Sequence, residues 1–201
     1  MENFQHSLSA HLSVQCSDNS KSQLIVLILP AMGAPTRLYK RLYDGILQAD
    51  LSVAIMNLRG EGLLKKDQLV SDGNFGYVEL LKDIDDVIAF ITHKYPNKSI
   101  VTIGHSLGGQ LGCLYSCHKN SDVLASFVIA NDFFAPYSST KSLLDKFPSS
   151  DRKISTIKAD SFKEVTPNHF SWLKEPEPAI NTFVSWLREK GLDRIACKSM
   201  E

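Results

Sequence analysis

The sequence lacks the charge pattern of a nucleic-acid-binding protein. Its 201 residues contain 22 Lys and Arg against 22 Asp and Glu, so the formal net charge is 0. The sequence has no excess of positive charge that would attract phosphates, and it has no run of acidic residues of the kind found in solvent-exposed acidic tails. We therefore expect no nucleic-acid partner. The chain has 43% hydrophobic residues, which is enough to form one sizeable core. At 201 residues it is too short for two domains of ordinary size.

The sequence also lacks a long apolar run. Its longest stretch, Leu24 to Met32, is far short of the roughly 20 residues that cross a membrane. The first residues, Met1 to His6, show no cationic start followed by an apolar segment, so no signal peptide is evident. We expect a cytoplasmic protein without a membrane span.

Cysteines are few and form no metal or redox motif. The four of them, Cys16, Cys113, Cys117 and Cys197, include no CxxC pair, which fits free thiols in a reducing compartment. A metal site at Cys113, Cys117 and His118 can be imagined, but small residues that share a helix face are more often buried against a sheet. We predict no metal and no organic cofactor.

The most informative segment is residues 100–109, Ile-Val-Thr-Ile-Gly-His-Ser-Leu-Gly-Gly. A β-branched apolar run ends in a Gly-x-Ser-x-Gly motif, and a helix-like segment follows at once. This context predicts a nucleophile elbow, which holds Ser106 in a strained conformation at the carboxyl end of a strand. Gly104 and Gly108 lack Cβ atoms, so the strand before the turn and the helix after it can approach closely. The backbone N–H of Leu107 then lies at a helix N-terminus.

Strands alternate with helices along the chain. Buried strands are expected from the apolar runs Leu24–Leu29 and Val123–Ala130, and further strands are expected at Leu51–Leu58, Ile100–Ile103 and Lys153–Ala159. Helices are expected from the apolar spacing over 37–48, Tyr77–Tyr95, Leu107–His118, 139–147 and Ala179–Lys190. Ser7–Gln15 alternates well enough for one antiparallel edge strand. This order predicts an α/β fold with a mostly parallel sheet, whose ligands bind beyond the carboxyl ends of the strands.

The candidate general base is His169. A serine nucleophile needs a histidine to take its proton and an acid to orient that histidine, and in this architecture the chain order is Ser, acid, His. Two histidines follow the elbow. His118 lies on or just past the elbow helix and comes too early, whereas His169 lies in a late loop before the last helix. His105, inside the motif, is expected to point away from Ser106 and to pack.

Two carboxylates compete for the place of the acid. Asp132 directly follows the expected strand Val123–Ala130. Asp160 follows the expected strand Lys153–Ala159 and leaves eight residues before His169. We favour Asp132, because a buried strand leads into it and the triad order allows it.

The oxyanion of acyl transfer needs two N–H donors. Leu107 is expected to supply one. The other is expected from the turn after the first parallel strand, Pro30-Ala31-Met32-Gly33, where Met32 offers its amide and Ala31 is the fallback.

These motifs together resemble those of the α/β-hydrolase superfamily, over most of the chain from Leu24 to Leu187. Residues 57–62 resemble the family's Asp-x-Arg-Gly-x-Gly turn, and residues 104–109 match its Gly-His-Ser-x-Gly-Gly elbow. Residues 132–136 resemble the Asp-x-x-x-Pro segment that carries the triad acid, and residues 169–172 resemble the catalytic-histidine loop. The turn after the first strand is similar to that of a bacterial branch of predicted hydrolases related to lysophospholipases and serine aminopeptidases.

The resemblance implies a serine hydrolase that acts on a carboxylic ester or related acyl bond of a small-molecule substrate. Ser106 would be the nucleophile, His169 the base and Asp132 the acid, and the spacing between the last two fits the bacterial branch. A non-catalytic or degenerate member of the fold, a peptidase and an acyltransferase are the alternatives, and the oligomeric state is left open.

The resemblance also implies a single α/β-hydrolase domain over residues 1–201, a three-layer sandwich with residues 1–20 as an N-terminal edge segment. Family members usually carry another strand and a helical cap between the elbow helix and the acid. Here residues 119–131 alone separate that helix from Asp132, so we expect no sizeable cap and an open site. If Val123–Ala130 instead precedes a lost cap, Asp160 inherits the role of the acid.

Overall fold

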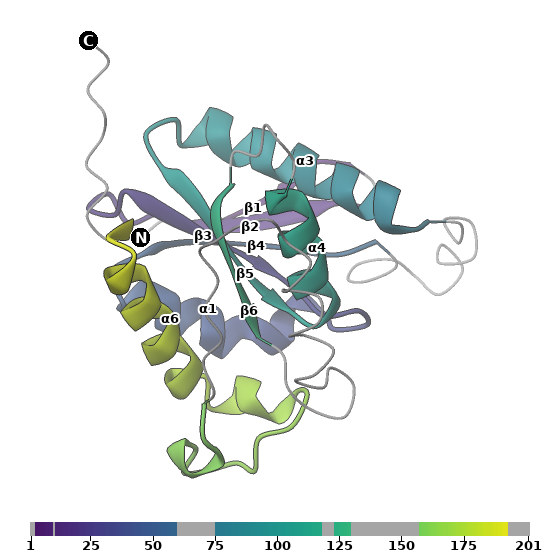
Figure 1. Ribbon diagram of the computed structural model, residues 1–201. Helices are drawn as coiled ribbons and strands as arrows, with labels where there is room; N and C mark the ends of the chain where they lie inside the picture. Colours follow the sequence, from purple (N-terminus) through teal and green to yellow (C-terminus); the bar gives the residue numbers. More distant parts are fainter. Residues whose placement is uncertain (1–2, 10, 60–74, 118–122, 130–156, 193–201) are drawn as a thin grey trace.

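A six-stranded sheet forms the centre of the protein, in the order β1-β2-β4-β3-β5-β6 (Figure 1). The structure, a computed structural model, describes residues 3–9, 11–59, 75–117, 123–129 and 157–192. Parallel pairing joins β3 (Leu24–Leu29), β4 (Ser52–Met56), β5 (Ser99–His105) and β6 (Val123–Ile129). Antiparallel pairing adds β1 (Asn3–Ser7) and β2 (Ser13–Ser17) beside β4. The mostly parallel sheet predicted from the sequence is confirmed.

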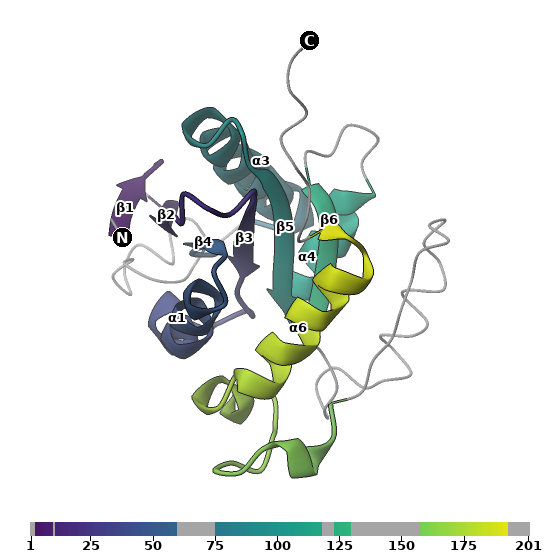
Figure 2. The same ribbon diagram turned by 90° about the vertical axis from the view of Figure 1, so that its left-hand side faces the viewer.

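Helices cover both faces of this sheet and make three layers (Figure 1 and Figure 2). One face carries α3 (Tyr77–Lys94) and α4 (Leu107–Ser116). The other face carries the 3-10 helix η1 (Thr36–Tyr39), α1 (Lys40–Gln48) and α6 (Glu177–Glu189). Strand β3 is apolar throughout because alternate side chains enter the two layers and all six residues are buried. None of the described helices is long and apolar enough to cross a membrane.

The N-terminal segment differs from the prediction of one edge strand over Ser7–Gln15. Strands β1 and β2 pair with each other across a turn, which the backbone N–H of Leu8 closes by donating to the Leu12 carbonyl at 2.8 Å. Strand β2 also pairs with β4, so it is an inner strand and its buried residues alternate with half-buried ones. The single-strand prediction is wrong because a hairpin turn falls inside the range.

Two other expectations change at the far side of the sheet. The strand expected at Val123–Ala130 is observed as β6, but it is half-buried, with Leu124 47% exposed, because it ends the described sheet and pairs with β5 alone there. Of the range Lys153–Ala159, the structure describes 157–159. A strand is wrong for that part, because Ala159 begins the 3-10 helix η2 (Ala159–Ser161). The helix expected over 139–147 lies outside the described residues.

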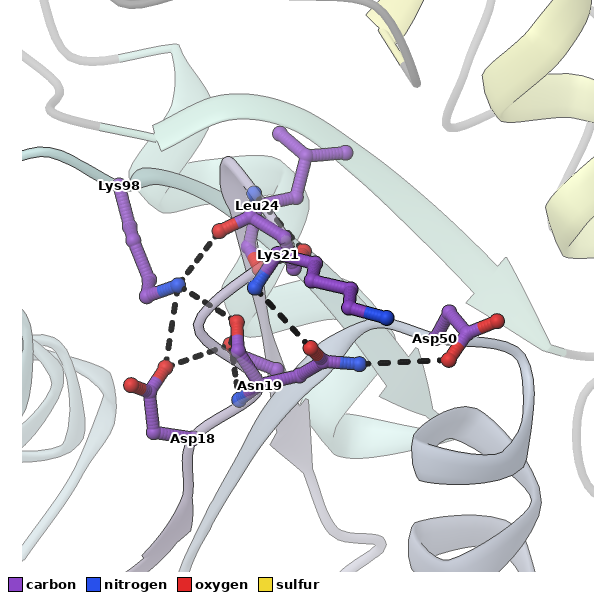
Figure 3. A network of polar contacts seen from close by, with 8 residues as sticks. Asp18, Asn19, Lys21, Leu24, Asp50 and Lys98 are labelled. Atoms are coloured by element: carbon purple, nitrogen blue, oxygen red, sulfur yellow. Dashed lines mark hydrogen bonds and ion pairs between the residues drawn. The ribbon is translucent and has the colours of Figure 1, made fainter. Parts of the chain in front are cut away.

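A lysine ammonium group ties two loops together at the edge of the sheet where the parallel strands begin (Figure 3). Lys98, just before β5, pairs with the Asp18 carboxylate at 3.0 Å and donates to the carbonyls of Asn19, at 2.9 Å, and Ser22. The latter three residues lie in the connection from β2 to β3. Because the Lys98 side chain is 11% exposed, water is a poor substitute for these acceptors.

We expect Lys98→Met to lower the free energy of unfolding by about 2 kcal/mol, because two carbonyls and one carboxylate each lose a charged donor. Thermal unfolding would show this as a fall of about 5 °C in Tm. Lys21→Met is the matched control, since Lys21 is an exposed lysine of the same connection. Equal melting temperatures for the two variants would contradict this account of the edge.

Candidate active site

Ser106 lies at a sharp turn between β5 and α4. Its backbone has φ 55° and ψ −117°, in the positive-φ region that residues other than glycine rarely adopt. Such strain costs of order 1–3 kcal/mol and persists where the surroundings enforce it. The Ser106 carbonyl accepts from the N–H of Gly109 at 2.9 Å, which starts the helix, and the Ser106 N–H donates to Ile129 of β6 at 3.3 Å. The strand, turn and helix that the motif predicts are all present.

Gly108 allows the first turn of α4 to lie directly against the end of β3. A Cβ atom at this position would overlap the carbonyl of Leu29 and come within 2.6 Å of the carbonyl oxygen of Pro30. As the first residue of α4, Leu107 has a backbone N–H with no acceptor inside the helix. The predicted donor at Leu107 therefore belongs to a helix end that adjoins the turn after β3.

The turn after β3, residues 30–33, is predicted from the sequence to bind the oxyanion and is here called the oxyanion turn for that predicted role. The N–H of Ala34 donates to the Ala31 carbonyl at 3.1 Å, and Gly33 has φ 75°, as in a type II turn. The N–H of Ala31 donates to the Tyr39 hydroxyl oxygen at 2.8 Å. The fallback donor Ala31 is thus already engaged, whereas Met32 is 69% exposed at the outer corner of the turn. Met32 remains the predicted second donor.

The loop that carries His169 lies beside the elbow. The ring centroid of His169 is 4.8 Å from that of His105, and the two planes are tilted by 42°. Because His105 directly precedes Ser106, the structure places the ring of the predicted base against the residue before the predicted nucleophile. His169 is half-buried, and the ring of Phe170 packs edge-on against it at 4.8 Å.

Short-range hydrogen bonds fix the His169 loop, and sequence reasoning did not predict them. The Asn168 side-chain oxygen accepts from the N–H groups of Phe170, at 3.0 Å, and Ser171, at 2.8 Å. In return, the Ser171 hydroxyl accepts from the N–H of Asn168 at 2.8 Å and donates to the Thr166 carbonyl at 2.7 Å. The signal that could have revealed this is the Asn-x-x-Ser spacing ahead of a short helix, here η3 (Ser171–Lys174).

Two further contacts hold the ends of the same loop. The Glu175 carboxylate accepts from the backbone N–H groups of Lys163 and Glu164, both at 2.7 Å. These bonds lower the pKa of the Glu175 carboxyl below its value in the unfolded chain. They therefore stabilise the fold at pH values above the unfolded-state pKa of Glu175, and this stabilisation is lost as the pH falls through the lowered pKa of the folded state. At the other end, Arg41 of α1 donates to the Lys174 carbonyl.

The structure describes one of the two candidate acids. Asp132 lies outside the described residues. Asp160 is described, and it is exposed to solvent in η2. The early histidine, His118, also lies outside the described part of the chain.

His105 packs, as predicted, but against the residues of the candidate site. It is 3% exposed, and its Nδ1 lies 2.8 Å from the Tyr39 hydroxyl oxygen. Phe170 and Trp172 meet its ring edge-on, with centroids at 5.4 and 5.3 Å. The sequence carried no signal for the pairing with Tyr39.

The turn after β4 is held by a partly buried ion pair. Arg59 donates through Nε and Nη2 to the two carboxylate oxygens of Asp83 in α3, at 2.7 and 2.9 Å. Asp83 is buried, and His11 Nε2 lies 3.6 Å from it. The Asn57 side chain donates to the His11 carbonyl at 2.7 Å. The described part of the motif at 57–62 therefore anchors this turn to α3 and to the N-terminal hairpin.

Cys113 of α4 and Cys117, which follows this helix, do not belong to a metal site within the described residues. Across the described ranges, no group of three or more His, Cys, Asp or Glu side chains is placed to hold a metal ion. Burial raises the pKa of the Cys113 thiol to about 11, which disfavours the thiolate that metals bind. Cys117 is exposed.

Comparisons with known proteins give relatives over much of the chain. The profile of the family described as "Serine aminopeptidase, S33" matches residues 20–169. Protein phosphatase methylesterase 1 of Candida albicans is 23% identical over 128 residues, which are 64% of this chain and 34% of that protein. The chain thus spans about a third of the length of this curated relative.

Solved structures show the same fold at low identity. An α/β serine hydrolase homologue from Coxiella burnetii matches with a TM-score of 0.55 and 14% identity, over 74% of this chain and 83% of that one. A dienelactone hydrolase from Anabaena variabilis matches with a TM-score of 0.53 and 16% identity, over 63% and 62% of the two chains. These likenesses concern the fold alone.

We expect Asn168→Ala to loosen the His169 loop, because the N–H groups of Phe170 and Ser171 lose their acceptor. Hydrogen exchange of these two amides, followed by NMR, should accelerate about tenfold. Asn168→Asp keeps an acceptor oxygen at the same position and should exchange like the unaltered protein. Unchanged exchange in Asn168→Ala would show that the loop is held by other contacts.

Proposed function

The chain belongs to the serine aminopeptidase S33 family and has the α/β-hydrolase fold, and from this premise we propose that it is a serine hydrolase of carboxylic esters or related acyl compounds. The observation that carries the proposal is the position of Ser106. Its strained backbone lies at the end of β5, and the residue before it contacts the ring of His169. We propose that His169 reaches the Ser106 hydroxyl from this position, because a histidine base activates a serine on such a turn for attack.

The proposed reaction proceeds through an acyl-enzyme. The Ser106 hydroxyl attacks the acyl carbonyl while His169 takes its proton, and the N–H groups of Leu107 and Met32 bind the resulting oxyanion. His169 then gives the proton to the leaving group. Water releases the acyl group in a second step with His169 again as the base. Asp132 orients His169 and stabilises its charged form.

Asp132 is our assignment for the acid because of where β6 ends. The Ile129 carbonyl accepts from the Ser106 N–H at 3.3 Å, so the end of β6 lies at the elbow. Asp132 follows three residues later, within about 10 Å along an extended chain. A triad acid is a buried partner of its histidine, whereas Asp160 is exposed. These observations support Asp132 over Asp160.

The substrate class that we propose is a small ester. The methylesterase relative acts on an ester by its name, and an alkoxide leaving group needs less help than an amine. Cleavage of an amide or transfer to another acceptor would use the same three residues and change the leaving group or the acceptor alone. The exposed Met32 and Phe170 beside the candidate site suit the apolar part of an acyl group.

Ser106→Ala should lower kcat for p-nitrophenyl butyrate by about a thousandfold or more, because the nucleophile is lost. The measurement is the initial release of p-nitrophenol, compared over acetate, butyrate and octanoate esters. Exposed Ser161→Ala serves as a control and should keep full activity. Equal rates for the unaltered protein and Ser106→Ala would refute the proposed function.

Asp132→Asn should lower kcat by about a hundredfold or more, because an amide neither stabilises the imidazolium nor keeps the histidine tautomer. Asp160→Asn is the matched control, and its kcat should stay within about twofold, as for other exposed sites. Both variants are compared by the same ester assay. A large loss in Asp160→Asn with none in Asp132→Asn would reverse the assignment.

A further inference from the structure

The Tyr39 hydroxyl joins two segments of the candidate site. Tyr39 ends η1 and is completely buried. Its oxygen accepts from the N–H of Ala31 at 2.8 Å and lies 2.8 Å from Nδ1 of His105. Ala31 belongs to the oxyanion turn, and His105 precedes Ser106 at the end of β5. A single oxygen atom therefore contacts the turn after β3 and the residue before the elbow.

The direction of the hydrogen bond between Tyr39 and His105 follows from the number of donors. The Tyr39 oxygen already accepts from Ala31, and a phenol has one proton to donate. Burial raises the pKa of the Tyr39 hydroxyl far above its usual value, so the proton stays on the oxygen. A buried hydroxyl proton needs an acceptor, and Nδ1 of His105 is the one beside it. His105 therefore accepts at Nδ1 and carries its proton on Nε2.

The ring of His105 forms one wall of the space occupied by His169. The two ring centroids are 4.8 Å apart, which is direct contact. Phe170 and Trp172, which belong to the His169 loop, meet the same His105 ring edge-on. The Trp172 indole N–H also donates to the His169 carbonyl at 3.1 Å. The orientation of the His105 ring thus limits where the whole His169 loop can lie.

We propose that Tyr39 is a positioning residue for the hydrolysis: it holds His169 through the ring of His105 and holds the oxyanion turn through the N–H of Ala31. This proposal rests on the function proposed above. Without the Tyr39 oxygen, the His105 ring loses its hydrogen bond at Nδ1, and the Ala31 N–H loses its acceptor. Both changes displace groups that act on the reacting atoms.

The position of Tyr39 predicts an effect on kcat rather than on KM. In the transition state a proton arrives at His169 while negative charge develops on the substrate oxygen that the N–H groups of Met32 and Leu107 bind. Tyr39 contacts the neighbours of these groups and so fixes the separation between the base and the oxyanion donors. A small displacement of either one weakens the transition state more than the bound substrate.

The test is Tyr39→Phe, which removes one oxygen atom and keeps the buried ring. We expect kcat for p-nitrophenyl butyrate to fall about tenfold while KM changes by less than about twofold. The second-order rate of labelling by a fluorophosphonate should fall in parallel, because attack by Ser106 uses the same base.

Tyr43→Phe is the matched control. Tyr43 lies one helical turn further in α1, is also buried, and donates through its hydroxyl to Ser17 at 2.8 Å. Ser17 pairs with Val53 near the start of β4, at the opposite end of the sheet from Ser106. Tyr43→Phe therefore removes an equivalent buried hydroxyl, and we expect a similar loss of Tm with kcat unchanged.

A second measurement needs no variant. Nitrogen-15 NMR of the histidine side chains should show His105 in the neutral tautomer protonated on Nε2.

Protonation of His105 on Nδ1 would overturn the proposal, and so would an unaltered kcat in Tyr39→Phe or equal losses of kcat in the two tyrosine variants. If the unaltered protein neither turns over esters nor takes a fluorophosphonate, the proposed function itself fails and this proposal falls with it. If the unaltered protein is active and the Tyr39→Phe variant is equally active, the positioning role of Tyr39 is wrong and the proposed function stands.

Discussion

The candidate site depends on the close contact between the first turn of α4 and the end of β3. This contact requires a residue without a side chain at Gly108, because a Cβ atom there would overlap the Leu29 carbonyl. It places the N-terminus of α4 beside the oxyanion turn and leaves Ser106 with a positive φ. The end of β3 against which the helix packs is itself held in place by apolar packing, since its six residues are all buried.

Much of this fold could be predicted from local sequence. The run Leu24–Leu29 is apolar at every position because both of its faces are covered, and the elbow is visible because glycine and serine recur at fixed spacing. Predictions were wrong where the outcome depends on neighbours in space. Strand β6 is half-buried because it lies at the end of the described sheet, and the N-terminal segment forms a hairpin because β2 has partners on both sides.

In the site, too, residues that belong to local motifs could be predicted, whereas contacts between residues far apart in the sequence could not. Ser106 and His169 could be proposed from motifs and chain order, and the structure places their loops together. The pairing of Tyr39 with His105 could not, since it joins residues 66 positions apart in elements that share no pattern. Tyr39 reads in the sequence as one more apolar residue of an amphipathic segment. The role of its hydroxyl becomes visible in the folded structure, where that oxygen contacts both the oxyanion turn and β5.

The central claim is that the strained serine at the elbow is a nucleophile. Its most direct test is to treat the protein with a fluorophosphonate, digest it and locate the adduct by mass spectrometry. Our account predicts one adduct, on the hydroxyl of Ser106, in the folded protein and none after denaturation. A folded protein that remains unmodified, or one modified at another serine, would contradict it.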